Sequence, residues 1–353
     1  MSWTGKPQAA EAEVLDRIEG AKRRLGETVT ILAHHYQRDE IVRFADHTGD
    51  SLELSRAAAT ARDARSIVFC GADFMAESAA LLCDSSQTVF LPAEAARCPM
   101  AGMADVSEAA MAWEGLNQVW GDDVVPITYQ NSSAQLKAFC GERDGAVCTS
   151  SNAGAVFRWA LRQKGHILFM PDEHLGRNTA LSLGLKEREV AVWDPQRPLA
   201  GQTGLEASRI VVWKGYCYVH TFFTVEQVRR AREEYPGATV IVHPECPAPV
   251  VARSDGAGST SYMVRAVHEA GPGTSFVVGT ETNLVNRLGA EHAEKTVVPL
   301  APSFCEAMGS ITPQNLLAAL EAILDGGTEG AVSVGVDTVE GARLALERMM
   351  SVV

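Results

Sequence analysis

One pattern of alternating strands and helices repeats three times along this chain, with a period of roughly 100 residues. Each copy opens with a β-branched or apolar run that ends in polar residues able to do chemistry, at residues 29–37, 124–131 and 239–246. Such runs are typical of buried parallel strands that carry functional groups at their carboxyl ends. The repeat therefore favours a fold made of three similar α/β units.

Small hydroxyl residues follow in each copy, just before a segment with helical apolar spacing. These residues are Ser51, Ser150, and Ser259 with Thr260. The spacing predicts that the hydroxyls lie at helix N-caps, where side-chain oxygens accept hydrogen bonds from the first free backbone amides. A second apolar strand comes next, at residues 66–78, 166–176 and 275–284, and each turns polar with an acidic residue just past its end.

A third apolar strand in each copy is predicted to end at a cysteine. These cysteines are Cys98, Cys217 and Cys305. Strands that alternate with helices predict parallel sheets, and ligands collect at the carboxyl ends of parallel strands. If the three units pack around a common axis, their polar strand ends converge on one site, and each unit contributes one cysteine to it.

The expected fold is α/β, with three pseudo-threefold related domains, each a short parallel sheet flanked by helices, around a central active site. The predicted domains are residues 1–108, which include an N-terminal helix, residues 109–222 and residues 223–353. These edges are approximate, because loops are where pattern reading is weakest.

Composition excludes several classes of function. The formal net charge is −13 and the acidic residues are spread along the chain, so no binding of nucleic acid or of an anionic membrane is expected. The N-terminal segment lacks the apolar stretch of a signal peptide, and no apolar run is long enough to span a membrane. We therefore expect a cytoplasmic protein.

Eight cysteines without CxxC pairs argue against a disulfide framework in such a chain. Cys70, Cys83 and Cys140 lie in predicted strands or helices and are expected to be buried packing residues. Cys148 and Cys246 stand beside other polar residues of the proposed site, so their role stays open. The three repeated cysteines could bind zinc, copper(I) or an iron-sulfur cluster, and three ligands with an open position are a catalytic arrangement.

Pairs of polar residues two apart occur at the three equivalent strand ends, so both members of a pair point to the same face. The pairs are His34 with Tyr36, Tyr129 with Asn131, and His243 with Glu245. We interpret them as a shared polar wall of the site. The residues between them, His35 and Gln130, point to the other face. His220 follows Cys217 by three residues and can serve as acid or base near neutrality.

Taken together, these segments resemble the quinolinate synthase family. The resemblance is carried, in this order and across most of the chain, by LAHHYQ, GDSLELS, ADFMAESA, CPMA, CTSSNA, GYCYVH, HPEC, GSTSYM and PSFCEAM. It implies three pseudo-threefold related α/β domains and a central four-iron four-sulfur cluster with three cysteine ligands, Cys98, Cys217 and Cys305. The open iron of that cluster would act as a Lewis acid.

The resemblance also implies the reaction, in which iminoaspartate and dihydroxyacetone phosphate condense to quinolinate, the precursor of NAD, with loss of phosphate and two waters. An aspartate oxidase or dehydrogenase is the expected metabolic neighbour. The residues predicted to contact substrate are His34, Ser51, Tyr129, Asn131, Ser150, His243, Glu245, Ser259 and Thr260. Helix N-termini are natural hosts for the anionic groups of these substrates. Tyr36, His220 and Glu245 are the predicted catalytic residues.

One departure from the family concerns the C-terminal ligand. Some relatives have several cysteines there, whereas this chain offers only Cys305, so no redox disulfide can form in that segment. Two other functions stay open. A mononuclear metal hydrolase could use the three cysteines, or His34, His243 and Glu245, as ligands. A non-enzymatic iron-sulfur sensor is the third candidate, although a sensor does not need so many convergent polar strand ends.

Overall fold

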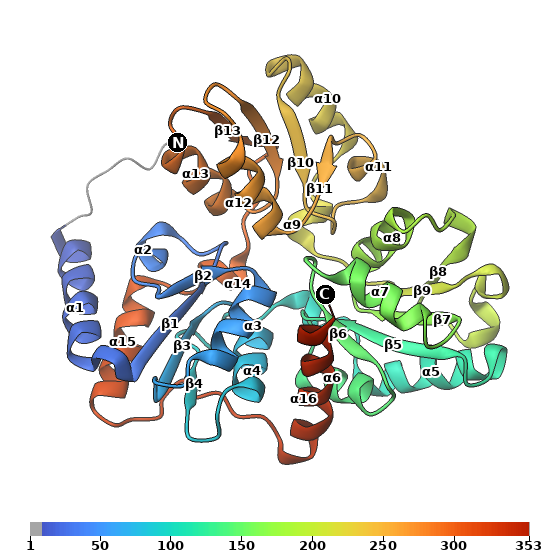
Figure 1. Cartoon of the computed structure of the whole chain (residues 1–353), viewed down its shortest axis with the longest axis horizontal. Helices are drawn as coiled ribbons and strands as arrows, with labels where there is room; N and C mark the ends of the chain where they lie inside the picture. Colours follow the sequence, from blue (N-terminus) through green and yellow to red (C-terminus); the bar gives the residue numbers. More distant parts are fainter. Residues whose placement is uncertain (1–8, 353) are drawn as a thin grey trace.

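Three separate parallel sheets, each flanked by helices, form three lobes around a common centre in the computed structural model, which describes residues 9–352 (Figure 1). The strand orders are β2-β1-β3-β4 in the first sheet, β6-β5-β7-β9-β8 in the second and β11-β10-β12-β13 in the third. All pairs within the sheets are parallel. This arrangement confirms the predicted α/β fold with three related units.

The three units share one order of strands and helices, to which the second unit adds an edge strand and short 3-10 turns. The first contains α1 (Ala9–Leu25), η1 (Gly26–Thr28), β1 (Val29–His34), α2 (Asp39–Val42), β2 (His47–Gly49), α3 (Ser51–Thr60), β3 (Ser66–Cys70), α4 (Asp73–Leu82), β4 (Thr88–Phe90) and the 3-10 turn η2 (Pro99–Gly102). The second contains α5 (Val106–Trp120), β5 (Val124–Tyr129), α6 (Ala134–Gly141), β6 (Ala146–Cys148), α7 (Ala153–Leu161), β7 (His166–Met170), α8 (Glu173–Ser182), η3 (Glu187–Glu189), β8 (Val190–Trp193), η4 (Leu199–Gly201), η5 (Leu205–Ala207), β9 (Ile210–Trp213) and α9 (Tyr218–Thr221). The third contains α10 (Val225–Glu234), β10 (Thr239–Val242), α11 (Ala248–Val251), β11 (Gly256–Ala257), α12 (Thr260–Glu269), β12 (Ser275–Gly279), α13 (Thr282–Glu291), β13 (Thr296–Pro299) and α14 (Glu306–Gly309). Only the second unit has an additional edge strand, β8.

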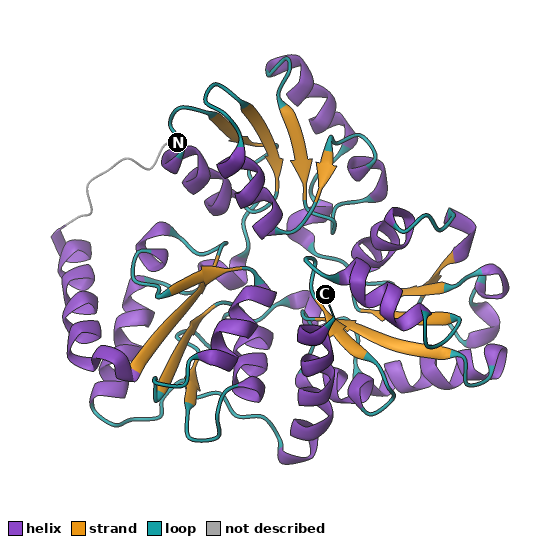
Figure 2. Ribbon diagram, viewed as in Figure 1, coloured by secondary structure: helices purple, strands orange, loops and turns teal. Residues whose placement is uncertain are grey.

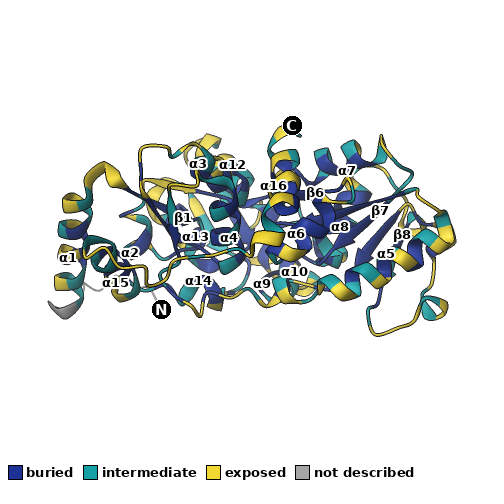
Figure 3. Ribbon diagram, turned by 90° about the horizontal axis from the view of Figure 1, so that it is seen from below, coloured by how far each residue is buried: buried dark blue, intermediate teal, exposed yellow. Residues whose placement is uncertain are grey.

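The strands of all three sheets direct their carboxyl ends toward the centre, as the arrowheads in Figure 2 show. Seen from the side in Figure 3, the molecule is flat, with α9 and α14 near one face and α3, α7 and α12 near the other. The inner strands are buried along their length, as expected for parallel strands covered by helices on both faces. The sheets therefore present their functional ends to one shared centre.

Two details of the sequence interpretation were wrong. The cysteines do not end the third strands: Cys98, Cys217 and Cys305 lie beyond β4, β9 and β13, in the loops that lead to η2, α9 and α14. The short strands β2, β6 and β11 escaped prediction, because two or three residues are too few to show a periodic pattern.

The predicted N-caps are only partly correct. Ser259 caps α12 and accepts a hydrogen bond from the Tyr262 backbone amide at 3.3 Å. Helix α3 is capped instead by Asp50, whose carboxylate accepts two amides in a capping box with Glu53, so Ser51 is the first helical residue. A carboxylate that receives two amides at the positive end of a helix is a stronger cap than a single hydroxyl.

In the second unit the N-cap of α7 is Asn152, so Ser150 lies two residues before the helix. Thr260 likewise follows the Ser259 cap and is the first residue of α12. The hydroxyls therefore lie at the helix N-termini as expected, but only one of them is a cap.

The C-terminal segment leaves the third unit and packs on the other two. Helix α15 (Pro313–Leu324) packs against α1, and α16 (Val336–Ser351) packs against α6, β6 and α4. The predicted domain boundaries after residues 108 and 222 stay predictions. Among the residues that the structure describes, no helix has the length and apolar character needed to cross a membrane.

Two glycines let α16 approach α6 closely. A Cβ atom on Gly141 would lie 1.9 Å from the Gly341 carbonyl oxygen, and one on Gly341 would lie 3.0 Å from the Ala138 carbonyl oxygen. Arg348 adds hydrogen bonds from Nη1 to the carbonyls of Gly141 at 3.0 Å and Gly145 at 2.7 Å. The contact between backbones leaves no room for a side chain.

We expect Gly141→Ala to destabilise the chain by about 1–3 kcal/mol, because the two helices must move apart. The matched control is Gly20→Ala in α1, where no atom lies within 4 Å of the added Cβ; it should stabilise by about 0.5–1 kcal/mol. Thermal and urea denaturation measure both effects. An unchanged midpoint for Gly141→Ala would contradict the close helix packing.

A buried lysine joins the first and second units. Lys137 on α6 is fully buried, and its ammonium donates to the Ser132 carbonyl at 2.6 Å and to the Phe74 carbonyl of α4 at 3.5 Å. Burial lowers the pKa of Lys137 to about 8, while the nearby Glu77 and Asp73 oppose the shift. In an unfolded chain a lysine titrates near pH ~10.4.

Between these two pKa values the folded protein has released the proton and the unfolded chain has kept it, so stability rises with pH. Below about pH 8 Lys137 is charged in both the folded and the unfolded chain, and the cost of burying its charge is fully present. We expect the native chain to gain up to about 3 kcal/mol relative to Lys137→Met between pH 7 and pH 10. Urea denaturation at several pH values measures this difference, and parallel pH profiles would contradict it.

Candidate active site

A single central pocket is lined by residues from all three units. It brings together nearly all of the predicted site residues: His34, Tyr36, Ser51, Cys98, Tyr129, Asn131, Ser150, Cys217, His220, His243, Glu245, Thr260 and Cys305. Ser259 is the exception, since its hydroxyl caps α12 and does not line the pocket. The three equivalent pairs at the ends of β1, β5 and β10 therefore share one wall, as their spacing predicted.

The three pocket cysteines occupy equivalent positions. Each is the N-cap of a single helical turn, and their φ, ψ angles agree closely: −81°, 117° for Cys98, −91°, 118° for Cys217 and −92°, 110° for Cys305. Near-identical backbone geometry orients their side chains in a similar way within each unit. The threefold relation inferred from the sequence is thus also found in the backbone dihedral angles of the three cysteines.

The three thiols influence one another electrostatically. Burial raises the pKa of Cys98 to about 12, and Cys305 adds to the shift. Burial also raises the pKa of Cys217, with further contributions from Glu245, Cys98 and Cys305. Bare thiolates are therefore unstable here, and a cationic partner would have to compensate their charge. Three soft thiols that line one pocket are a donor set that fits an iron-sulfur cluster.

The remaining cysteines do not line the pocket. Cys70, Cys140, Cys148 and Cys246 are buried, and Cys83 is half-buried. Cys246 places its thiol 3.9 Å from the Gly279 carbonyl. Packing therefore accounts for Cys148 and Cys246 as well, the two residues whose role the sequence left open.

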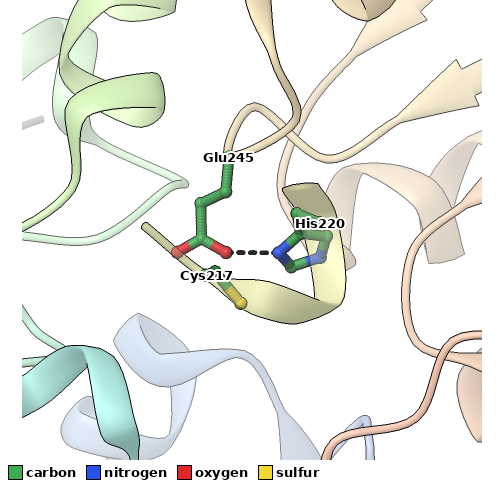
Figure 4. Close-up of side chains that lie close together, drawn as sticks. All are labelled: Cys217, His220 and Glu245. Atoms are coloured by element: carbon green, nitrogen blue, oxygen red, sulfur yellow. Dashed lines mark ion pairs between the residues drawn. The ribbon is translucent and has the colours of Figure 1, made fainter. Parts of the chain in front are cut away.

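Glu245 is the electrostatic centre of the pocket (Figure 4). Its Oε2 lies 2.5 Å from Nδ1 of His220 and 3.3 Å from Nδ1 of His243, and the two imidazoles stack with centroids 4.2 Å apart. Glu245 comes from the turn after β10, whereas His220 lies on α9 beside Cys217. The carboxylate thus connects the third unit to the cysteine turn of the second.

The protonation of this group follows from burial and charge. Burial lowers the pKa of His220 to about 4, and His243 acts in the same direction. Burial by itself raises the pKa of Glu245, but His243 and His220 lower it by more, so the net shift is downward. Near neutral pH the pocket therefore contains an ionised carboxylate beside a neutral His220 imidazole.

Two buried polar atoms in this group lack a hydrogen bond within the described part of the chain, Oε1 of Glu245 and Nδ1 of His220. The Nδ1 atom of His220 is close to Oε2 of Glu245, but the contact does not have the angle of a hydrogen bond. Buried polar atoms are costly to leave unpaired. Their presence at the pocket wall marks a place where a bound molecule would supply the partners.

Tyr36 extends the network toward the third unit. Its hydroxyl lies 2.6 Å from Thr280 Oγ1 and 3.2 Å from His220 Nε2, and Thr280 is itself 3.1 Å from the same nitrogen. Burial raises the pKa of Tyr36 well above its usual value. The hydroxyl therefore stays protonated and can pass a proton along a chain that ends at Glu245.

His34 and His243 are fixed in the same way in their units. The Nδ1 of His34 accepts the Tyr36 amide at 3.2 Å, and the Nδ1 of His243 accepts the Glu245 amide at 3.4 Å. For His34 this contact assigns the ring proton to Nε2. Nδ1 of His243 also lies 3.3 Å from the Glu245 carboxylate, a contact that suits a protonated nitrogen. Burial lowers the pKa of His34, so its imidazole is neutral and offers an N–H donor to the pocket.

Tyr129 and Asn131 supply the wall from the second unit. Burial raises the pKa of Tyr129, and the nearby Glu245 carboxylate raises it further. Asn131 directs its amide nitrogen toward the Cys98 sulfur, at 3.9 Å. An amide group is thus available both to a sulfur ligand and to a substrate.

Sequence reasoning missed two polar residues of this site. Thr280 follows β12 directly and has no counterpart in the pairs, so no repeated pattern singled it out. Asp50 lines the pocket and bonds to Ser151 in the second unit, while Glu53 accepts Ser261 of the third unit at 2.6 Å. The spacing of Asp50 and Glu53, which is that of a capping box, was the sequence signal that could have singled out Asp50.

The ligand atoms of Cys217, His220 and Glu245 lie within 4.8 Å of one another, a possible mononuclear site. Among the described residues, neither the set expected for a hydrolase, His34 with His243 and Glu245, nor the three cysteines form a group this compact. The Nδ1 atoms of both histidines are occupied by backbone amides, which leaves only Nε2 for a metal. The three cysteines differ from both sets in that they stand at equivalent positions of the three units.

Comparisons with known proteins agree with the geometry. Residues 16–351 match the family model described as quinolinate synthetase A protein. A quinolinate synthase of Corynebacterium glutamicum is 48% identical over 351 residues, covering 98% of this chain and 89% of the relative. A quinolinate synthase of Halalkalibacterium halodurans is 46% identical (97% and 94% covered), and one of Bacillus anthracis is 45% identical (95% and 92% covered).

Proposed function

The chain belongs to the quinolinate synthase family, whose enzymes act in NAD biosynthesis, and we propose that its central pocket condenses iminoaspartate with dihydroxyacetone phosphate. Phosphate and two waters are released as the pyridine ring closes. The observation that carries the proposal is the convergence of three equivalent cysteines and three polar strand-end pairs on one pocket. We keep the expectation that the reaction takes place in the cytoplasm, coupled to an aspartate oxidase or dehydrogenase.

The proposed cofactor is a four-iron four-sulfur cluster held by Cys98, Cys217 and Cys305. Three thiols with matching backbone geometry, all in one pocket, support this ligand set. Such a cluster leaves one iron without a protein ligand, which supplies Lewis-acid chemistry toward a substrate oxygen. Every other function of the site falls to the residues of the chain.

Anion binding is the first of these functions. The substrates carry carboxylates and a phosphate, yet no lysine or arginine is found among the described residues that line the pocket. Ser51 and Thr260 are the first residues of α3 and α12, and both line the pocket. The Leu52 and Glu53 amides of α3 are already bound by the Asp50 cap, so Ser51 contributes its hydroxyl group. With Ser150 before α7, these residues bind the anionic groups, and Ser259 fixes the start of α12.

Proton transfer is the second function. Glu245 is ionised and buried, so it accepts a proton from a substrate carbon or nitrogen placed beside it. The His220 imidazole and the Tyr36 hydroxyl hold protons along the chain of contacts from Glu245 to Thr280. The Nε2–H group of His34, with His243, Tyr129 and Asn131, orients the substrate oxygens.

Exclusion of water is the third function. Iminoaspartate is an imine and hydrolyses in water, so a site that uses it must be shielded. Buried apolar residues, among them Phe74, Met75, Met100 and Met308, form part of the pocket lining. A closed pocket also strengthens the electrostatic contacts within it.

Cluster ligation is tested by replacing each cysteine in turn. We expect Cys98→Ser, Cys217→Ser and Cys305→Ser to lose most of the bound iron and the broad visible absorption of an iron-sulfur protein. Iron and sulfide analysis after anaerobic purification measures the loss. Cys83→Ser is the control, because that half-buried thiol lies outside the pocket. A Cys305→Ser protein with a full cluster and normal turnover would show the assignment to be wrong.

Glu245→Gln tests the proton-transfer role. The amide keeps the shape of the side chain but cannot accept a proton, so kcat for quinolinate formation should fall by about 10²–10⁴-fold. Iron content should stay at the native level, which separates a chemical defect from loss of the cluster. Glu226→Gln on the exposed side of α10 is the control and should retain native activity. Native kcat in Glu245→Gln would remove this residue from the mechanism.

A further inference from the structure

Two residues of the proposed proton chain stand in turns of the same form. In each turn the backbone amide of the fourth residue donates to the carbonyl of the first, from Gln37 to His34 at 2.9 Å and from Cys246 to His243 at 3.0 Å. The third residue is Tyr36 in the first unit and Glu245 in the third unit. The direction in which each of these side chains leaves the backbone therefore depends on how its turn is held.

A buried asparagine of the second unit binds the turn that carries Glu245. The Nδ2 group of Asn178, on α8, donates to the Pro244 carbonyl at 2.8 Å and to the Cys246 carbonyl at 2.8 Å. An amide NH2 group has two donors, so it satisfies both carbonyls at once. These carbonyls precede and follow Glu245 in the chain. A side chain of one unit thus fixes the backbone that carries the carboxylate of another.

A buried arginine of the third unit binds the turn that carries Tyr36. Nη1 of Arg287, on α13, donates to the Gln37 carbonyl at 2.9 Å, and Nη2 donates to the His35 carbonyl. Asn283, one helical turn earlier in α13, donates to the Tyr36 carbonyl at 3.2 Å. One helix of the third unit therefore binds three consecutive carbonyls of this turn.

Asn178 and Arg287 stand at equivalent positions of their units. Each is the sixth residue of its helix, α8 after β7 and α13 after β12. The carbonyls that they bind also correspond, since they belong to the residues just before and just after the third polar residue of the turn. A contact that only joined two units could attach anywhere on the facing surface. Its repetition at the same two carbonyls, by two different side chains, points to the residue between them.

The second unit makes part of the same connection with a different residue. The sixth residue of α4 is Ser78, whose hydroxyl donates within its own helix, to the Phe74 carbonyl at 2.8 Å. The Ser132 carbonyl, which follows Asn131, is bound instead by the Lys137 ammonium at 2.6 Å. The carbonyl after the second member of each polar pair is thus bound by a buried side chain in all three units.

We propose that Asn178 and Arg287 are positioning residues for the proton chain. Asn178 holds the turn of Glu245, and Arg287 holds the turn of Tyr36, so that both side chains meet at His220. This inference rests on the proposed function. Neither positioning residue lines the pocket, so each acts through the backbone that it binds. The contacts with the His220 ring are 2.5 Å and 3.2 Å long, and a displacement of about 1 Å can lower turnover by about 10²-fold.

The first test measures kcat for Asn178→Leu and Arg287→Met, in the full chain loaded with its cluster without oxygen. Both replacements nearly keep the length of the side chain but donate no hydrogen bond. We expect kcat per bound cluster to fall by about 10–100-fold, with iron content at the native level. Asn178→Ser and Arg287→Lys keep a polar group and should show a smaller fall. They replace the first pair if the larger changes prevent folding.

Combined variants separate positioning from a general structural role. Residues that act through one another have non-additive effects on turnover. Asn178→Leu should therefore lower kcat by no more than about twofold in a Glu245→Gln chain, and Arg287→Met should do the same in a Tyr36→Phe chain. A defect that is only structural would lower kcat by the same factor with and without the catalytic side chain.

The matched control is Arg348→Met. Arg348 also joins distant segments by donating to two backbone carbonyls, but those of Gly141 and Gly145 lie outside the pocket. Its kcat per bound cluster should be native.

Three results would overturn the inference alone, with Glu245→Gln and Tyr36→Phe impaired as expected. These are native kcat in the positioning variants, an equal loss with and without the catalytic side chain, and an equal loss in Arg348→Met. Native kcat in both Glu245→Gln and Tyr36→Phe would instead overturn the proposed proton chain, and the inference with it.

Discussion

Parallel pairing within each sheet determines where the functional groups of this molecule can be. Parallel strands joined by helices all end at the same edge of their sheet, so the polar residues that follow them gather at that edge. Three sheets then direct these edges toward one centre (Figure 2). Each unit alone offers one cysteine and one polar pair. A complete site exists only where the three edges meet.

Burial at that centre gives the groups their chemical character. In the proposed reaction, a chain of net charge −13 binds anionic substrates without a lysine or arginine among the described residues of the pocket wall, and relies on helix N-termini and neutral imidazoles. The same burial keeps Tyr36 protonated and His220 neutral, while the two histidines beside Glu245 keep that carboxylate ionised. A series of proton transfers requires proton donors and proton acceptors within hydrogen-bond distance of one another, and this group contains both.

Local pattern was sufficient to predict much of the fold and the site. The two-residue spacing of His34 with Tyr36 and of His243 with Glu245 reflects strand geometry, which depends only on neighbouring residues. Features that depend on distant parts of the chain were missed. Thr280 belongs to the site only because β12 passes beside Tyr36, and Asp50 replaced Ser51 as a cap because Glu53 completes its capping box.

The cysteines illustrate both what the local pattern predicted and what it missed. Their equivalence was visible in the repeats, but their position in the loops beyond the strands was not, because loop lengths differ among the three units. The packing of α15 on α1 and of α16 on α6 could not be inferred either. Such contacts join segments far apart in the sequence and depend on details such as the facing Gly141 and Gly341.

The position of α16 has a consequence for the biogenesis of the protein. This helix follows all three units in the chain, yet it packs between elements of the first and the second. During synthesis the first two units emerge early, but their junction lacks α16 until the third unit has also been made. Cys305 emerges late as well. The pocket that the three units line together is therefore complete only after all three have been translated.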